Sequence, residues 1–179
     1  MVSNKFPKNA KKVFSWKIFN VYNREQELFD WSKAIFEWIE RKPCITALAR
    51  DKEWNYIILK ERQPWKNWFY WLISWMIEEW EEPLDWAIRE LWEETWYEFD
   101  KIELIWVHDD WWEWGKMQSN RYMYFADWWI KTKDQKLDPW EEIIVNIIKK
   151  EDINEFLESK FSDFDKNLIK KYFKDKLPK

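Results

Sequence analysis

Three glutamates that follow Pro83 are spaced so that their carboxylates come together on one helix. At 3.6 residues per turn, Glu90, Glu93 and Glu94 fall within an arc of about 100°. Like charges at this spacing repel by roughly a few tenths of a kcal/mol per pair, and a bound cation would remove that repulsion. Oxygen ligands with no histidine nearby favour Mg²⁺ or Mn²⁺ over Zn²⁺. The alternative interpretation is a solvated acidic face.

The element that must position these carboxylates is a helix over residues 83–95. Pro83 suits the first turn of a helix, because its fixed φ is already helical and its missing N–H would have no partner there. A neighbouring arc of the same helix is apolar and is expected to face the core. It consists of Leu84, Ala87, Ile88 and Leu91.

The segment from residue 75 to residue 97 resembles the Nudix box. That motif is a glycine, five residues, a glutamate, seven residues, Arg-Glu, an aliphatic residue, any residue, Glu-Glu, any residue, a glycine and an aliphatic or similar residue. Every non-glycine position of the motif is matched, by Glu81, Arg89, Glu90, Leu91, Glu93, Glu94 and Tyr97. Both glycine positions hold tryptophan instead, at Trp75 and Trp96.

The resemblance implies a role for each matched residue. Glu90, Glu93 and Glu94 would be the metal ligands, with the backbone carbonyl of Trp75 as a fourth. Arg89 would hold a glutamate in position through an ion pair. The implied cofactor is Mg²⁺ or Mn²⁺.

Residues outside the box are similar to ADP-ribose pyrophosphatases of the Nudix family, over residues 14–51, 58–83 and 161–173. In such relatives the general base lies on an acidic loop far downstream, which makes Glu142 or Glu141 the candidate here. Arg62 is a candidate contact for substrate phosphate or carboxylate. The alternatives are two solvated acids and an exposed strand end. No proline occurs in 109–120, where ADP-ribose enzymes often carry one, and this puts the substrate in doubt.

The implied reaction is hydrolysis of the pyrophosphate bond of a nucleoside diphosphate linked to a group X, with ADP-ribose or a nucleotide sugar as substrate. Other Nudix substrates, dinucleoside polyphosphates or nucleoside triphosphates, are the alternatives within the enzyme class. A nucleotide-binding regulator that does not catalyse hydrolysis is the alternative outside it. The intact run Arg-Glu-Leu-Trp-Glu-Glu favours the enzyme, because a binder need not keep carboxylates that repel.

The chain holds 19 tryptophans and one glycine, whereas average usage of about 7% would give about 13 glycines. The tryptophans stand in turn dipeptides that glycine normally completes, because glycine accepts positive φ without a Cβ clash. Such dipeptides end at Trp31, Trp65, Trp68, Trp86, Trp111, Trp128 and Trp140. The stretch DKEWNY likewise reads as a hairpin turn with Trp54 in the glycine position.

This pattern suggests a recoded codon: UGA encodes glycine in the source, and the sequence was translated with UGA as tryptophan. Gly115 would then come from an ordinary glycine codon. Trp38 and Trp92, at positions that require no turn, would be genuine tryptophans. The rival hypothesis is a protein that is truly rich in tryptophan.

The pattern of elements predicts an α/β fold, a Nudix α/β/α sandwich with a mixed central sheet and an N-terminal antiparallel strand extension. The extension covers residues 1–42 and the Nudix domain residues 43–179. Expected strands cover residues 13–22, 33–41, 44–50, 55–62, 69–75, 102–109, 121–131 and 143–149, and a glycine-rich loop is expected over 109–116. Two further helices are expected, over 151–160 and over 162–175, the latter with Ser162 as its N-cap and Phe164, Leu168, Ile169 and Phe173 against the sheet.

Composition excludes several classes of protein. A net charge of −4 and a pI of about 5.3 argue against a general nucleic-acid or anionic-membrane surface. The single Cys44 excludes an internal disulfide and fits a reducing compartment, and no apolar run reaches the length of a membrane span. We expect a cytoplasmic protein, without nucleic-acid or membrane partners. By the family resemblance, we also expect a homodimer built through residues 13–41, with apolar surface from Phe14, Ile18, Phe19 and Val21.

Overall fold

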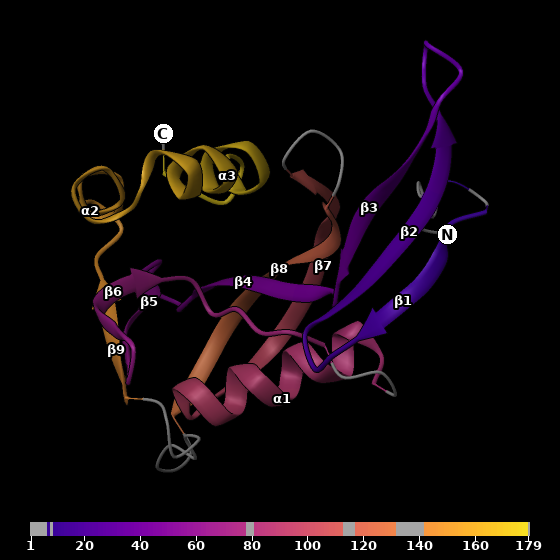
Figure 1. The fold of residues 1–179 in the computed structure, drawn as a ribbon. Helices are drawn as coiled ribbons and strands as arrows, with labels where there is room; N and C mark the ends of the chain where they lie inside the picture. The colour runs from indigo at the N-terminus through magenta and orange to yellow at the C-terminus, as the bar shows by residue number, and fades with distance from the viewer. Residues whose placement is uncertain (1–6, 8, 78–80, 113–116, 132–141, 179) are drawn as a thin grey trace. The chain divides into compact units, whose positions relative to one another are not determined.

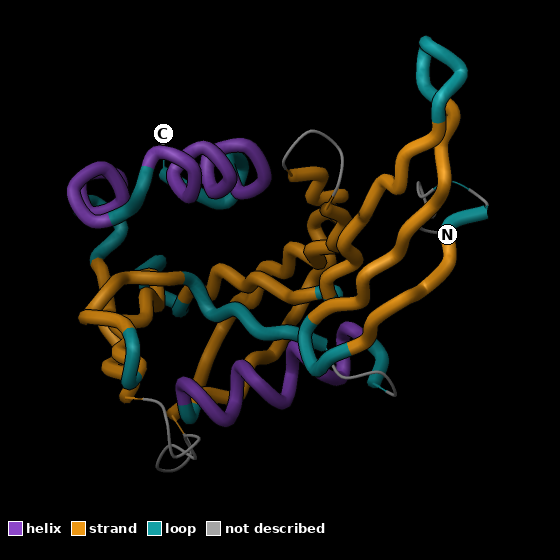
Figure 2. Tube along the Cα trace, in the orientation of Figure 1, coloured by secondary structure: helices purple, strands orange, loops and turns teal. Residues whose placement is uncertain are grey.

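The computed structural model describes residues 7, 9–77, 81–112, 117–131 and 142–178 of the chain (Figure 1). The strands are β1 (Lys11–Ser15), β2 (Phe19–Glu27), β3 (Lys33–Arg41), β4 (Cys44–Arg50), β5 (Tyr56–Gln63), β6 (Lys66–Trp71), β7 (Tyr97–Trp112), β8 (Met117–Lys131) and β9 (Glu142–Ile148). The helices are α1 (Pro83–Thr95), α2 (Ile153–Lys160) and α3 (Asp163–Phe173). Figure 2 shows the same elements by type.

The chain divides into two compact units. One comprises residues 1–44 and 108–121, and the other comprises residues 45–107 and 122–179. The long strands β7 and β8 therefore contribute residues to both units. The predicted boundary between residues 42 and 43 stays a prediction.

In the first unit, β1, β2 and β3 form an antiparallel meander, as the sequence predicts for the N-terminal region. Strand β3 also pairs in parallel with the start of β8, at Ile39 with Met117 and at Glu40 with Gln118, so the pairing is mixed. The predicted single strand over 13–22 is wrong. It is two strands joined by a hairpin, in which the Trp16 N–H donates to the Phe19 carbonyl at 2.9 Å.

In the second unit, β5 pairs antiparallel with β4, β6 and β9. Alternation along β5 sends Ile57 and Leu59 into one core cluster, and Tyr56 and Ile58 into another, on the opposite face of the strand. The expected strand over 69–75 is shorter, since β6 ends at Trp71. The glycine-rich loop expected over 109–116 is wrong for 109–112, which belong to β7, and residues 113–116 lie outside the described residues.

The helices of the second unit divide between these two clusters. Helix α1 contributes Trp86, Ala87 and Leu91 to the cluster that holds Ile57 and Leu59. Helices α2 and α3 pack into the other cluster, so α1 covers one face of the strands and the C-terminal helices cover the other (Figure 1). The elements are thus those of a mixed α/β protein.

Helix α3 begins as its sequence predicts. The Ser162 hydroxyl accepts a hydrogen bond from the Asp165 N–H at 3.2 Å, which satisfies one of the donors that the first turn leaves without a partner. Three of the four residues of the predicted apolar stripe are buried, namely Leu168, Ile169 and Phe173. Phe164 is 53% exposed, because it lies in the first turn beyond the packed face, and the prediction for it is wrong.

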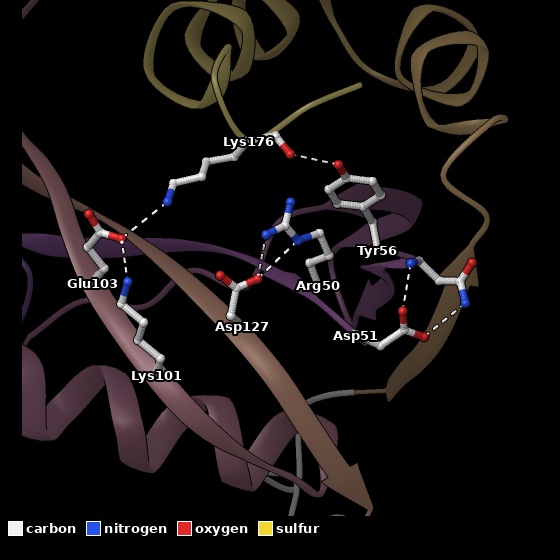
Figure 3. Close-up of polar contacts among 8 residues, drawn as sticks. Arg50, Asp51, Tyr56, Lys101, Glu103, Asp127 and Lys176 are labelled. Carbon is white, nitrogen blue, oxygen red and sulfur yellow. Dashed lines mark hydrogen bonds and ion pairs between the residues drawn. The ribbon is translucent and has the colours of Figure 1, made fainter. Parts of the chain in front are cut away.

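Polar contacts fasten the C-terminal segment to the strands of the second unit (Figure 3). The Tyr56 hydroxyl donates to the Lys176 carbonyl at 2.6 Å, and the Lys176 ammonium donates to Glu103 at 3.1 Å. Nearby, the largely buried Arg50 pairs with Asp127 at 2.8 Å. In this packing Arg50 and Lys176 are each paired with a carboxylate.

Candidate active site

Helix α1 carries the predicted cluster, and its buried face differs from the predicted one. Glu90 and Glu94 are buried at 8% and 2% exposure, whereas Leu84 and Ile88 are 43% and 47% exposed. The prediction that Leu84 and Ile88 face the core is therefore wrong. The physical reason is that the buried face of α1 also includes Trp86. This face consists of Trp86, Ala87, Glu90, Leu91 and Glu94. The helix is turned about its axis so that two carboxylates lie against the core.

Arg89 is at the centre of the acidic cluster. Its guanidinium lies 2.8 Å from the Glu90 carboxylate, 2.7 Å from that of Glu93 and 3.5 Å from that of Glu81. Burial opposes the charge of the guanidinium, but the neighbouring carboxylates outweigh it, and the pKa of Arg89 is raised. The sequence predicts one ion pair for Arg89, and the structure brings three of the motif's carboxylates to it.

The cluster has more negative charge than Arg89 can balance. Three carboxylates share this guanidinium, and the buried Glu94 lies one helical turn beyond Glu90. Among the residues that the structure describes, no group of three or more His, Cys, Asp or Glu side chains is arranged to hold a metal ion. An all-carboxylate donor set nonetheless fits a hard divalent cation such as Mg²⁺. The ligand set Glu90, Glu93 and Glu94 stays a prediction.

Residue 75 lies where the chain leaves the sheet ahead of α1. Beyond β6, Ile73 forms a bridge with Ala47, and the Trp75 carbonyl then accepts a hydrogen bond from the Ile45 N–H at 2.8 Å. A carbonyl oxygen has two lone pairs, so this bond leaves one for a metal ion. The Trp75 indole packs against the same core cluster as α1, and its buried Nε1 has no hydrogen-bond partner.

The two candidate residues away from α1 are brought together. Arg62 lies opposite Glu142 in the β5–β9 ladder, and its guanidinium lies 2.5 Å from the Glu142 carboxylate. Both side chains are about half exposed, so a substrate could reach the pair. Glu141, the alternative base, lies outside the described residues.

Glu61 is a buried carboxyl group that the sequence analysis did not single out. It is 4% exposed and lies on the face of β5 that carries Ile57 and Leu59, the face covered by α1. Burial raises the pKa of Glu61, although a hydrogen bond from the Gln63 amide, at 2.5 Å, lowers it in part. The alternation along 55–62 was the signal that could have found it, because Glu61 follows two apolar residues of the same face.

The raised pKa of Glu61 predicts a pH-dependent stability. The folded state holds this proton more tightly than the unfolded state, so stability is lost as pH rises through the folded pKa. We expect the stability of Glu61→Gln to fall less as pH rises. The measurement is the urea midpoint of unfolding at pH values from about 4 to 8. Glu151→Gln, at an exposed position, is the matched control. If the urea midpoint changes equally with pH in the parent chain and in Glu61→Gln, burial of Glu61 has no such effect.

Comparison with known proteins identifies the fold. No protein-family model matches the chain. No curated protein matches it either. Among solved structures, the fold is similar to that of an ADP compounds hydrolase, with a TM-score of 0.62 and 15% identity, over 83% of this chain and 81% of that one. The chain therefore has a mixed α/β fold like that of this hydrolase. In the part of the chain that the structure describes, no helix has the length and apolar character needed to cross a membrane.

Proposed function

We propose that the chain hydrolyses the pyrophosphate bond of a nucleoside diphosphate linked to a group X, with ADP-ribose or a nucleotide sugar as the substrate and Mg²⁺ or Mn²⁺ as the cofactor. The observation that carries the proposal is the cluster on α1, where Arg89 joins Glu81, Glu90 and Glu93 on a Nudix-like fold. The complete α/β/α sandwich of that family is part of the proposal.

Each residue of the cluster has a definite part in such a reaction. Arg89 holds Glu90 and Glu93 in place, and Glu90, Glu93, Glu94 and the Trp75 carbonyl would hold the metal ion. When bound, a divalent cation offsets the negative charge that develops on the phosphate oxygens. Glu142 or Glu141 takes a proton from the attacking water as its oxygen bonds to phosphorus and the bridging P–O bond breaks. The products are a nucleoside monophosphate and a phosphorylated X.

The Arg62–Glu142 pair bears on which group acts as the base. The Arg62 guanidinium contacts the Glu142 carboxylate at 2.5 Å and so competes with water for the same oxygen. Substrate phosphate that binds Arg62 would compete for the guanidinium and release Glu142. Substrate binding and activation of the base would then be coupled through one residue.

The proposed activity is tested by incubating the purified chain, with the proposed glycines restored, with a nucleotide panel. The panel contains ADP-ribose, nucleotide sugars, a dinucleoside polyphosphate and nucleoside triphosphates, each with Mg²⁺ and with a chelator. We expect Mg²⁺-dependent release of a nucleoside monophosphate from ADP-ribose or a nucleotide sugar. Binding without cleavage of any member would overturn the proposal in favour of a nucleotide-binding regulator.

We further propose a homodimer that forms through the N-terminal strands. Strand β1 lies at the end of the β1–β2–β3 meander and is exposed along its whole length, with Phe14 and Trp16 stacked at 6.2 Å between ring centroids. Exposed apolar surface of this kind marks an interaction site. We expect the mass of a dimer by light scattering, and that of a monomer for Val13→Lys combined with Phe14→Lys. A monomer at high concentration with full activity would count against the dimer.

A further inference from the structure

We infer that residues 31, 54 and 96 are glycine in the protein as its source makes it. These are the non-glycine residues of the described chain that have positive φ, at 67°, 69° and 65°. All three are written as tryptophan, although tryptophan makes up only 19 of 179 residues. The left-handed region disfavours a residue with a Cβ, and a bulky aromatic gains nothing there in return. This observation is independent of the proposed activity and of any resemblance to a motif.

Two of the three positions are tight turns between strands. In the β2–β3 hairpin, the Trp31 N–H donates to the Leu28 carbonyl at 3.1 Å, and in the β4–β5 hairpin the Trp54 N–H donates to the Asp51 carbonyl at 3.1 Å. The Trp31 side chain is 81% exposed, so its burial does not offset the backbone strain. Glycine is the ordinary residue at such positions.

Trp54 makes contacts that could argue for a genuine tryptophan. The Arg50 guanidinium lies 3.8 Å from the centre of its ring, and the Lys150 ammonium lies 4.8 Å from it. Arg50 does not depend on this ring, because it pairs with Asp127 at 2.8 Å and lies 5.0 Å from the Phe125 ring. Glycine at residue 54 would therefore leave Arg50 in place.

The third position is the C-terminus of α1. The Trp96 N–H donates to the Trp92 carbonyl at 2.9 Å while the residue itself is left-handed, which is the αL motif that glycine most often supplies. The turn must occur here because β7 begins at Tyr97. A residue without a Cβ lets the helix that carries Glu90 and Glu94 end without strain.

A different observation adds residue 75 to the inferred glycines. The indole Nε1 of Trp75 is buried without a hydrogen-bond partner, whereas a buried tryptophan N–H usually has one. Glycine at residue 75 removes this donor. The turn that the sequence predicts at Trp86 is wrong, because this residue lies within α1 and is buried in the core cluster. A UGA codon decoded as glycine accounts for residues 31, 54, 75 and 96 together, and it requires a glycine tRNA whose anticodon pairs with UGA.

The direct test is peptide mass spectrometry of the protein isolated from its source. We expect glycine at residues 31, 54, 75 and 96, and tryptophan at residues 38 and 92. Tryptophan at residue 31, 54 or 96 in the native peptides would overturn the inference.

Thermal unfolding of the recombinant chain tests the physical argument separately. The triple variant Trp31→Gly, Trp54→Gly and Trp96→Gly is expected to raise the Tm by about 3–8 °C over the chain as written, because relief of strain exceeds the entropy that glycine costs. The matched control, Trp38→Gly with Trp92→Gly, is expected to lower the Tm, since those residues lie within β3 and α1. A triple variant that unfolds at a lower Tm, or does not fold, would contradict the argument.

Discussion

Replacing Glu94 by glutamine is expected to lower Mg²⁺-dependent turnover by at least about a hundredfold, on the scale of losing one preorganised charge at an active site. Glu94 is 2% exposed and lies one helical turn from Glu90, so the substitution removes a buried negative charge and keeps the shape of the side chain. The fold is expected to survive, because the apolar contacts of α1 do not involve the charge.

The control for Glu94→Gln is Glu155→Gln, which removes an exposed carboxylate from the first turn of α2. It should leave turnover unchanged, while the Tm of both variants stays close to that of the parent chain. Near-normal Mg²⁺-dependent turnover in Glu94→Gln would contradict the assignment of Glu94 as a metal ligand.

Glycine at residues 75 and 96 is expected to raise turnover by about a hundredfold over the chain as written. Misplacement of catalytic groups by about 1 Å costs a factor of this size. Trp75 carries the carbonyl that would hold the metal ion and has a buried indole Nε1 without a hydrogen-bond partner, and Trp96 ends α1 in a strained conformation. Glycine at both positions lets this backbone relax and approach a diphosphate.

The control for this gain is the pair Trp38→Gly and Trp92→Gly, which changes the same number of tryptophans. That pair should not raise turnover. If the chain as written already turns over as fast as the glycine variant, tryptophan at residues 75 and 96 does not limit the activity.

The helices α1 and α3 lie where the sequence predicts them because each carries a start signal. Pro83 marks the start of α1, and Ser162 with its acidic first turn marks the start of α3. The hairpin between β1 and β2 was missed because its turn contains Trp16 where a glycine would have marked it. The turn between β4 and β5 is predicted correctly because DKEWNY lies between two strand-like runs and reads as a hairpin turn with glycine at residue 54.

The motif predicted which residues lie on α1 but not how the helix is turned. Periodicity alone indicates that the apolar residues Leu84 and Ile88 face the core. It does not show that Trp86, on the same face as Glu90, is buried instead. Glu142 and Arg62 are 80 residues apart, and only the pairing of β9 with β5 joins them.

Product analysis tests the proposed activity most directly, with ADP-ribose incubated with the chain in which residues 31, 54, 75 and 96 are glycine. We expect AMP and a phosphorylated ribose in equal amounts, with Mg²⁺ required and both products lost in Glu94→Gln. If this well-folded chain yields neither product from ADP-ribose or any nucleotide sugar with Mg²⁺ or Mn²⁺, the account of a nucleoside diphosphate hydrolase is contradicted.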